Sequence, residues 1–174
     1  VSLDAVRIDD DMLTDRRHYL NGLNFATNLV FFRDGGGQHT RLVTANYWSG
    51  YGAKNPGMWC CLMDAGGIPI AEWRDALPGA YGTVVIDSAE VRRRFDLGDF
   101  TGHIFLHILH VAGHDIVKYA LDTYGDAATS LSCTHDANAW PAEFYAGVPA
   151  PKDGERVVVW VQNSHPAPIP ARGI

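Results

Sequence analysis

The sequence is poor in cysteine. Its 174 residues include only three, Cys60, Cys61 and Cys133. Three cysteines cannot build the paired framework of a small disulfide-rich secreted domain. Adjacent cysteines rarely bond to each other, so one bridge to Cys133 is the most that this sequence offers. Cysteine usage therefore favours a cytoplasmic protein. Export is the alternative, because a processed N-terminus would no longer carry its leader.

The sequence also lacks a basic excess and a long apolar run. It contains 14 Lys and Arg against 20 Asp and Glu, which gives a net charge of −6 at pH 7. Nucleic-acid binding needs a basic face that neutralises phosphates, so we do not expect nucleic acid as a partner. No apolar run approaches the roughly 20 residues of a membrane-spanning helix, so we do not expect a membrane partner.

Helical periodicity is scarce, and the β-α-β rhythm of a parallel sheet is missing. Eighteen glycines and nine prolines imply frequent turns. The segments between these turns alternate apolar and polar residues with the period of two that strands show. We therefore predict an all-β fold, a two-sheet antiparallel β-sandwich of about eight or nine short strands. One short helix is expected near 88–95, with Asp87 at its N-terminus as a cap.

Composition changes twice along the chain. Residues 1–22 are polar and acidic, and we predict that they form an N-terminal arm. Residues 23–162 contain the predicted strands of the β-sandwich domain, the last of them at 156–162. Residues 163–174 form a Pro-rich C-terminal tail, which extended proline geometry would keep out of the sheet.

Four of the eight histidines lie in one apolar stretch, at positions 103, 107, 110 and 114. On a helix, this spacing would place all four on one face, which would indicate a metal site. The β-branched residues of this stretch and the alternation from Val117 to Thr123 favour strands instead. We predict a β-hairpin that turns at 112–114, in which the histidines scatter.

A metal site remains the alternative hypothesis. Cys133 and His135 would point to the same side of a strand, about 7 Å apart at their Cα atoms, and neighbouring histidines could complete a site for zinc or another divalent metal. No C-x-x-C, H-E-x-x-H or G-x-S-x-G motif is present. We therefore expect no cofactor and leave open whether the protein is an enzyme, favouring a non-enzymatic role. The candidate metal ligands are His103, His107, His110, Cys133, His135 and Asp136.

Aromatic residues gather in two segments, and exposed aromatic rings on a β-sandwich can stack on a ligand. Packing in the core is the alternative role for the same side chains. We expect a non-catalytic β-sandwich binding module for a protein or carbohydrate partner, which could also self-associate as a homo-oligomer. A metal-binding protein or metal-dependent enzyme is the second hypothesis. The candidate ligand-binding residues are Tyr47, Trp48, Tyr51, Trp59, Trp140 and Tyr145.

Overall fold

The computed structural model describes residues 25–113, 116–127, 131–135 and 150–158. The chain divides into two compact units, Val1–Asp136 and Ala137–Ile174. The predicted domain boundaries after residues 22 and 162 lie outside the described residues. Within the described part of the chain, no helix is long and apolar enough to cross a membrane.

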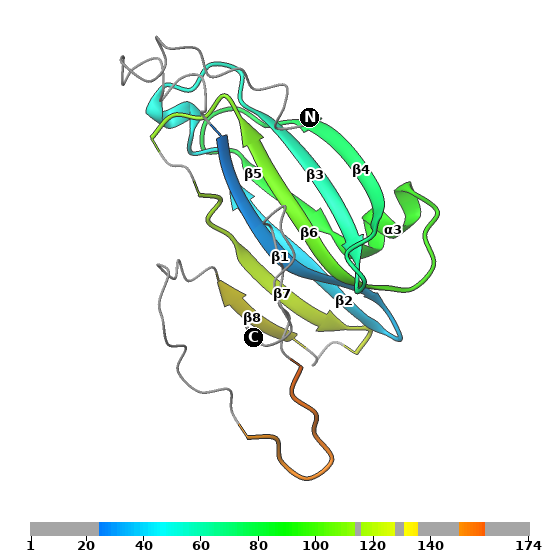
Figure 1. Ribbon diagram of the computed structural model, residues 1–174. Helices are drawn as coiled ribbons and strands as arrows, with labels where there is room; N and C mark the ends of the chain where they lie inside the picture. Colours follow the sequence, from blue (N-terminus) through cyan, green and yellow to red (C-terminus); the bar gives the residue numbers. More distant parts are fainter. Residues whose placement is uncertain (1–24, 114–115, 128–130, 136–149, 159–174) are drawn as a thin grey trace, which may run out of the picture. The chain divides into compact units, whose positions relative to one another are not determined.

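The first unit contains all the strands that the structure describes (Figure 1). A 3-10 turn, η2 (Ser49–Tyr51), follows the second strand, and a short helix, α3 (Ser88–Arg94), follows the fifth. The strands are β1 (Phe25–Gly35), β2 (Gln38–Ala45), β3 (Gly57–Asp64), β4 (Pro69–Ala76), β5 (Thr83–Asp87), β6 (Phe100–Leu109), β7 (Ala120–Gly125) and β8 (Leu131–His135). In the second unit, residues 156–158 are not in a strand, and the rest of the predicted strand 156–162 lies outside the described residues.

These eight strands pair antiparallel in one sheet, in the order β4-β3-β6-β1-β2-β7-β8, and β5 pairs with β2. The all-β prediction is therefore confirmed. Hydrogen bonding joins the strands into one sheet, however, and not into the two separate sheets that the sequence predicted. The predicted helix is confirmed at Ser88–Arg94, where the Asp87 side chain accepts a hydrogen bond from the Ala89 amide at 3.0 Å.

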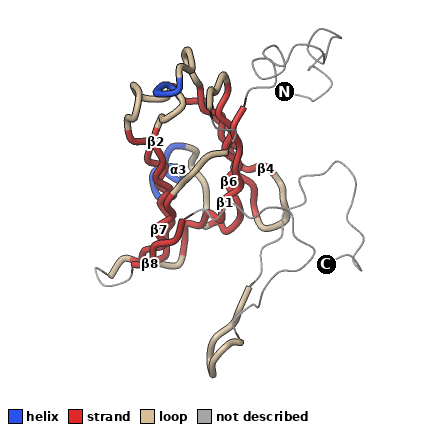
Figure 2. The backbone as a smooth tube through the Cα atoms, turned by 90° about the vertical axis from the view of Figure 1, so that its left-hand side faces the viewer, coloured by secondary structure: helices blue, strands red, loops and turns tan. Residues whose placement is uncertain are grey.

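The sheet changes direction at the turn between β1 and β2. These strands pair only at Asp34–His39 and Gly35–Gln38, and beyond this corner β1 pairs with β6 while β2 pairs with β5 and β7. At the next position along the strands, the Thr40 hydroxyl takes the place of the backbone-to-backbone hydrogen bonds. It accepts a hydrogen bond from the Arg33 amide at 2.9 Å and donates one to the Arg33 carbonyl at 3.1 Å. Figure 2 shows β2 and β7 on one side of the unit, with β1, β4 and β6 on the other.

Both groups of strands contribute side chains to one hydrophobic core. On β6, the fully buried Ile104, Leu106 and Ile108 alternate with side chains that point away from the core. Leu42 on β2 and Ile86 on β5 join the same cluster from the other group of strands. The period of two along β6 thus arises because one face of this strand packs into the core and the other does not.

The predicted hairpin between the segments 102–113 and 117–123 is wrong. Each segment contains a strand, but β6 pairs with β1 and β3, whereas β7 pairs with β2 and β8. Between them, the chain runs beside β1, where Ile116 forms a parallel bridge with Thr27 and the Asn28 side-chain amide donates to the Val117 carbonyl at 2.9 Å. Alternation identifies a strand, but it does not identify the strand's neighbours.

Candidate functional site

The candidate metal ligands lie on strands that are separated in the sheet. His103 and His107 are on β6 and Cys133 and His135 are on β8, with β1, β2 and β7 between them in the sheet order. Asp136 lies outside the described residues. In the described part of the chain, no group of three His, Cys, Asp or Glu side chains is arranged so that it could hold a metal ion. The described residues therefore contain no assembled ligand set.

Both histidines of β6 are partly or fully buried, and His107 lies among aromatic side chains. The His107 ring is 5.7 Å from the Trp59 ring and 5.4 Å from the Phe105 ring, measured between centroids. Burial lowers the pKa of both His103 and His107, because a charged imidazole would lose its hydration there. His110 follows the end of β6, exposed to solvent and in the left-handed region of backbone conformation, with φ of 58°.

Cys133 is exposed on β8 and lies opposite Asp122 on β7. A hydrogen bond to this carboxylate raises the pKa of the Cys133 thiol above its ordinary value. Metal binding and nucleophilic attack both require the thiolate, which the neighbouring negative charge disfavours. The environment of Cys133 therefore does not activate it as a nucleophile.

Three of the candidate aromatic residues have internal partners. Trp48 is fully buried in the core, and the ring of Tyr47 packs against it at 4.1 Å between centroids. The Tyr47 hydroxyl donates to the Ile116 carbonyl at 2.6 Å, so it holds the segment that crosses beside β1. Trp59 is half-buried and donates from its indole nitrogen to Glu72 at 2.8 Å. Trp140 and Tyr145 lie outside the described residues.

Tyr51 differs from these residues because it is exposed, with 57% of its surface accessible. Tyr81, in the β4–β5 loop, is 69% exposed. Both tyrosines belong to one group of loops, which we call the tyrosine end and define as residues 46–56, 78–82 and 110–113. Tyr81 is not among the ligand-binding residues that the sequence predicted. Its one sequence signal is an aromatic residue enclosed by the turn residues Gly79 and Gly82.

Each exposed tyrosine ring rests against a glycine. A Cβ atom on Gly50 would overlap the Tyr81 ring, and a Cβ on Gly113 would come within 2.6 Å of Cγ of Tyr51. The glycines thus let the rings lie directly against the backbone, and contact on one side restricts their motion. Such rings can bind a ligand with little further loss of conformational entropy.

Asn46 joins the loops of the tyrosine end, although it is itself buried. Its side-chain amide donates to the Ser49 hydroxyl at 2.9 Å and to the Pro78 carbonyl at 2.7 Å. Its backbone accepts a hydrogen bond from the Tyr81 amide at 2.8 Å and donates to the Gly82 carbonyl at 2.9 Å. One buried residue therefore fixes the positions of the turn before Tyr51 and of the loop that carries Tyr81.

The tyrosine end also concentrates unusual backbone conformations. Among the described residues, four non-glycine residues have positive φ, and three of them lie here: Asn55 at 51°, Tyr81 at 61° and His110 at 58°. A bulky side chain such as tyrosine rarely adopts this conformation, because its Cβ approaches the backbone. Strain of this kind persists where the surroundings enforce it, and it clusters at functional sites.

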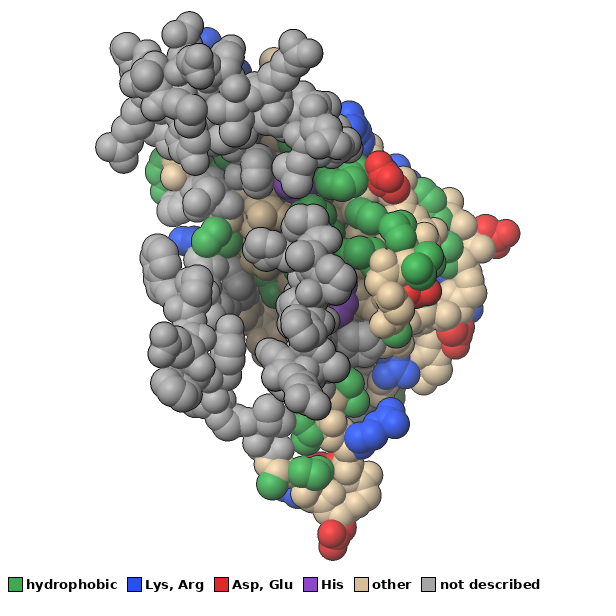
Figure 3. Space-filling view, viewed as in Figure 1, with side chains coloured by type: hydrophobic (Ala, Val, Ile, Leu, Met, Phe, Trp, Pro, Cys, Tyr) green, Lys and Arg blue, Asp and Glu red, His purple; other side chains and the backbone are tan. Residues whose placement is uncertain are grey.

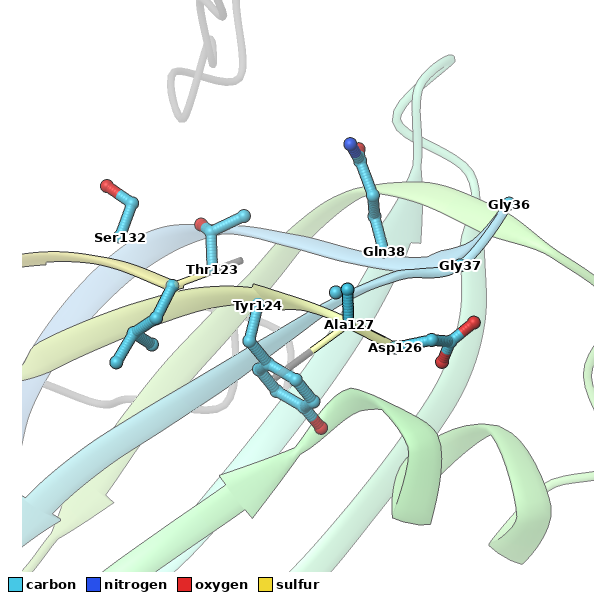
Figure 4. Close-up of a pocket in the computed structure, with 10 residues that line it drawn as sticks. Gly36, Gly37, Gln38, Thr123, Tyr124, Asp126, Ala127 and Ser132 are labelled. Carbon is cyan, nitrogen blue, oxygen red and sulfur yellow. The ribbon is translucent and has the colours of Figure 1, made fainter. Parts of the chain in front are cut away.

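A pocket lies beside the β1–β2 corner, at the C-terminal end of β7. We call it the corner pocket; it has a volume of about 510 Å³, and its floor includes Gly36 and Gly37. Figure 4 shows Gln38, Thr123 and Ser132 on one side of the strands, while Tyr124 points to the opposite side. The pocket is within the size range of ligand sites, but Tyr124, the one aromatic residue among its lining residues, points away from these polar side chains.

His39 follows the pocket residue Gln38 on β2 and lies between two carboxylates. Its Nδ1 is 2.8 Å from buried Asp34 and its Nε2 is 3.0 Å from exposed Asp126. Hydrogen bonds to Asp34 and then to Asp126 raise the pKa of His39 above 6.5. Burial alone would raise the pKa of Asp34, but hydrogen bonds from His39, Arg92 and Ser88 hold it below 3.8. Both ring nitrogens are thus within hydrogen-bonding distance of a carboxylate, so this imidazole links Asp34 to Asp126 at the corner, and neither nitrogen is available to act as a base.

Comparisons of the chain with protein-family models, with curated proteins and with solved structures found no match. The function therefore has to be inferred from the local geometry of the described surface. Of its regions, the tyrosine end combines exposed rings, a buried polar residue that fixes its loops, and strained backbone. This combination is suited to binding a ligand that stacks on the exposed rings. Such binding does not require catalysis.

Proposed function

We propose that the protein is a non-catalytic binding module that recognises a carbohydrate through the tyrosine end. The observation that carries this proposal is the pair of exposed tyrosine rings, Tyr51 and Tyr81, each with ring atoms packed against a glycine. The C–H groups on one face of a sugar ring form an apolar surface that packs on an aromatic ring. A tyrosine also offers a hydroxyl at its rim for the sugar hydroxyls.

We further propose that the sheet serves as a β-sandwich, in which the two groups of strands act as layers on either side of the shared core. In such modules, loops at one end of a rigid framework carry recognition, and the framework keeps them in place. The loops of the tyrosine end follow β2, β4 and β6, which belong to both groups of strands. A ligand there would contact loops anchored on both layers.

The direct test is binding of the full chain to a panel of soluble polysaccharides and arrayed glycans, followed by calorimetry on any ligand found. Tyr51→Ala and Tyr81→Asn should each weaken binding about tenfold, because loss of a stacked ring costs on the order of 1–2 kcal/mol. Asparagine is chosen at position 81 because it tolerates positive φ. Tyr51→Phe keeps the ring and should bind nearly as well as the parent.

Leu131→Ala serves as the matched control, because Leu131 is an exposed apolar residue on β8, outside the tyrosine end. This variant should bind the carbohydrate like the parent chain. Circular dichroism and thermal unfolding of each variant show whether the fold is intact. Absence of binding to every glycan overturns the proposal, and so does binding that neither tyrosine variant weakens.

A further inference from the structure

The tyrosine end differs in charge from the rest of the chain. Asp and Glu make up 20 of the 174 residues and the net charge is −6 at pH 7, yet no Asp or Glu lies within 46–56, 78–82 or 110–113. Lysine and histidine are present there instead, as Lys54 and His110. In the view of Figure 3, acidic side chains lie along the right-hand side of the sheet, and basic side chains are visible at the upper edge. The exposed tyrosines are thus bordered by groups that attract an anion.

Strand pairing and chain connectivity place Lys54 and His110 near Tyr51. Gly57 pairs with Leu109 where β3 and β6 reach this end of the unit. His110 directly follows this pair, and Lys54 precedes it by three residues. The Tyr51 ring packs against the loop that follows His110, and Lys54 is three residues from Tyr51, a stretch that spans at most about 11 Å. Both Lys54 and His110 are exposed, so a ligand that stacks on Tyr51 is within reach of both.

No neighbour that the structure describes neutralises Lys54. Within the described residues, neither Lys54 nor His110 forms an ion pair or a side-chain hydrogen bond. Asp75, on β4 just before the 78–82 loop, is instead paired with Arg94, 3.0 Å away. Residues 114–115, a histidine and an aspartate, lie outside the described residues. No described ion pair therefore has to break when the ammonium of Lys54 binds an anion.

A second lysine adjoins the tyrosine end. The backbone amide of Lys118 donates to the Tyr47 hydroxyl at 3.0 Å, and the Lys118 side chain is exposed. Because Tyr47 belongs to the tyrosine end, this contact places another cation at its border. The potential there is thus more positive than the net charge of the chain suggests.

The chemistry of these side chains selects the kind of anion. An ammonium and an imidazole N–H both donate hydrogen bonds, and such bonds to a carboxylate are charge-assisted. A uronic acid combines a carboxylate with the apolar C–H face that packs on an aromatic ring. Single-stranded nucleic acid also stacks on aromatic rings, but its sites follow the phosphate backbone with a basic groove, and the net charge of −6 disfavours it. A sugar acid therefore fits these residues better.

We propose that the tyrosine end recognises an acidic carbohydrate, whose carboxylate binds Lys54 and His110 while a sugar ring stacks on Tyr51. This inference rests on the proposed carbohydrate binding and adds the charge of the ligand to it. Lys118, at the border of the same site, attracts the polymer at longer range. Binding should therefore depend on salt, because dissolved ions screen exposed charges over about 8 Å at physiological ionic strength.

The test compares acidic polysaccharides with neutral polymers of the same backbone. Polygalacturonate, alginate and hyaluronate are each titrated into the full chain before and after chemical reduction of their carboxylates to alcohols. We expect the chain to bind at least one acidic polymer. Reduction should weaken that binding about fivefold to tenfold, because two exposed charge contacts are lost. Raising the ionic strength from about 0.05 M to about 0.5 M should weaken binding of the acidic form only.

Charge variants of Lys54 separate an electrostatic contact from a structural one. Lys54→Gln should weaken binding of the acidic polymer about threefold and leave binding of its reduced form unchanged. Lys54→Arg keeps the charge and should bind the acidic polymer like the parent. Arg93→Gln is the matched control, because it removes the same charge from an exposed position on α3. This helix follows the end of β5 opposite Thr83 and the tyrosine end, so the variant should bind like the parent.

The other outcomes separate this inference from the proposed function. Equal binding of the acidic and reduced polymers, with both weakened by Tyr51→Ala, would overturn the inference and leave carbohydrate binding standing. A preference for the acidic form that Lys54→Gln does not reduce would overturn it too. Absence of binding to every polysaccharide and glycan would overturn both proposals. Tighter binding of oligothymidylate than of any polysaccharide would also overturn both and assign the tyrosine end to single-stranded nucleic acid.

Discussion

Replacing His39 by leucine should destabilise the fold by about 2–3 kcal/mol at pH 6. The hydrogen bond from protonated His39 to buried Asp34 is charge-assisted, and such bonds contribute about 1.5–3 kcal/mol. The contact with Asp126 adds less than about 1 kcal/mol, because the Asp126 side chain is 78% exposed and well solvated. Asp34 keeps Arg92 at 3.1 Å and Ser88 at 3.0 Å, so the loss stays below that of a fully broken buried pair.

The destabilisation should depend on pH in one direction. The folded state raises the pKa of His39 above its ordinary value of 6.5, so the folded protein binds this proton more tightly than the unfolded chain does. The stabilisation is therefore complete below pH 6.5 and declines as the pH rises through the raised pKa. Neutral His39 still donates one hydrogen bond, so the difference between parent and variant should shrink to about 1 kcal/mol at high pH.

Urea denaturation of the parent and of His39→Leu at pH 5.5, 7 and 9, followed by circular dichroism, gives the difference in free energy of unfolding at each pH. The buried histidines of β6 titrate in both proteins, so their contribution cancels in the difference. Asp126→Asn is the control and should cost less than about 1 kcal/mol at every pH. A difference for His39→Leu that stays constant, or that grows as the pH rises, would refute this account of the corner.

Two further substitutions test the fold around the candidate site. Asn46→Ala should lower the free energy of unfolding by about 2–3 kcal/mol, because the Ser49 hydroxyl and the Pro78 carbonyl lose their buried donor. It should also weaken carbohydrate binding, which calorimetry would measure. Gly102→Ala should cost more than about 3 kcal/mol or prevent folding, since a Cβ there would overlap the backbone of β3 at Met63. Gly98→Ala, where nothing lies within 4 Å of the added Cβ, should leave the thermal unfolding temperature unchanged.

Local features of the sequence were sufficient to identify most strands and the helix. Glycines at 35–37 mark the β1–β2 turn in the sequence, and all three have positive φ. Asp87 predicted the start of α3 because a cap requires only a side chain and the amide two residues later. The pairing of β6 could not be predicted in the same way. It depends on which strands share the core with Ile104 and Leu106, and that is a property of the whole chain.

The candidate site was predictable only in part, because an aromatic residue in a turn carries no sign of its burial. Trp48 and Tyr51 are three residues apart, yet Trp48 is fully buried and Tyr51 is exposed. The difference arises from η2, which turns the chain between them after Asn46 has fixed its start. Tyr81 approaches the same loops from the β4–β5 connection, and its proximity to Gly50 exists only in the folded chain.

Side-chain hydrogen bonds satisfy backbone groups at several positions where the two groups of strands separate. The Thr40 hydroxyl serves both backbone groups of Arg33 where β2 departs from β1. Further along, Thr44 donates to the Lys118 carbonyl at 2.6 Å, and Asn28 and Tyr47 hold the neighbouring backbone. Strand edges satisfied in this way cannot template pairing with another chain. Polar residues within the strands thus bond to backbone groups where the two groups of strands separate, whereas the two exposed tyrosines of the proposed binding site lie in the loops at the end.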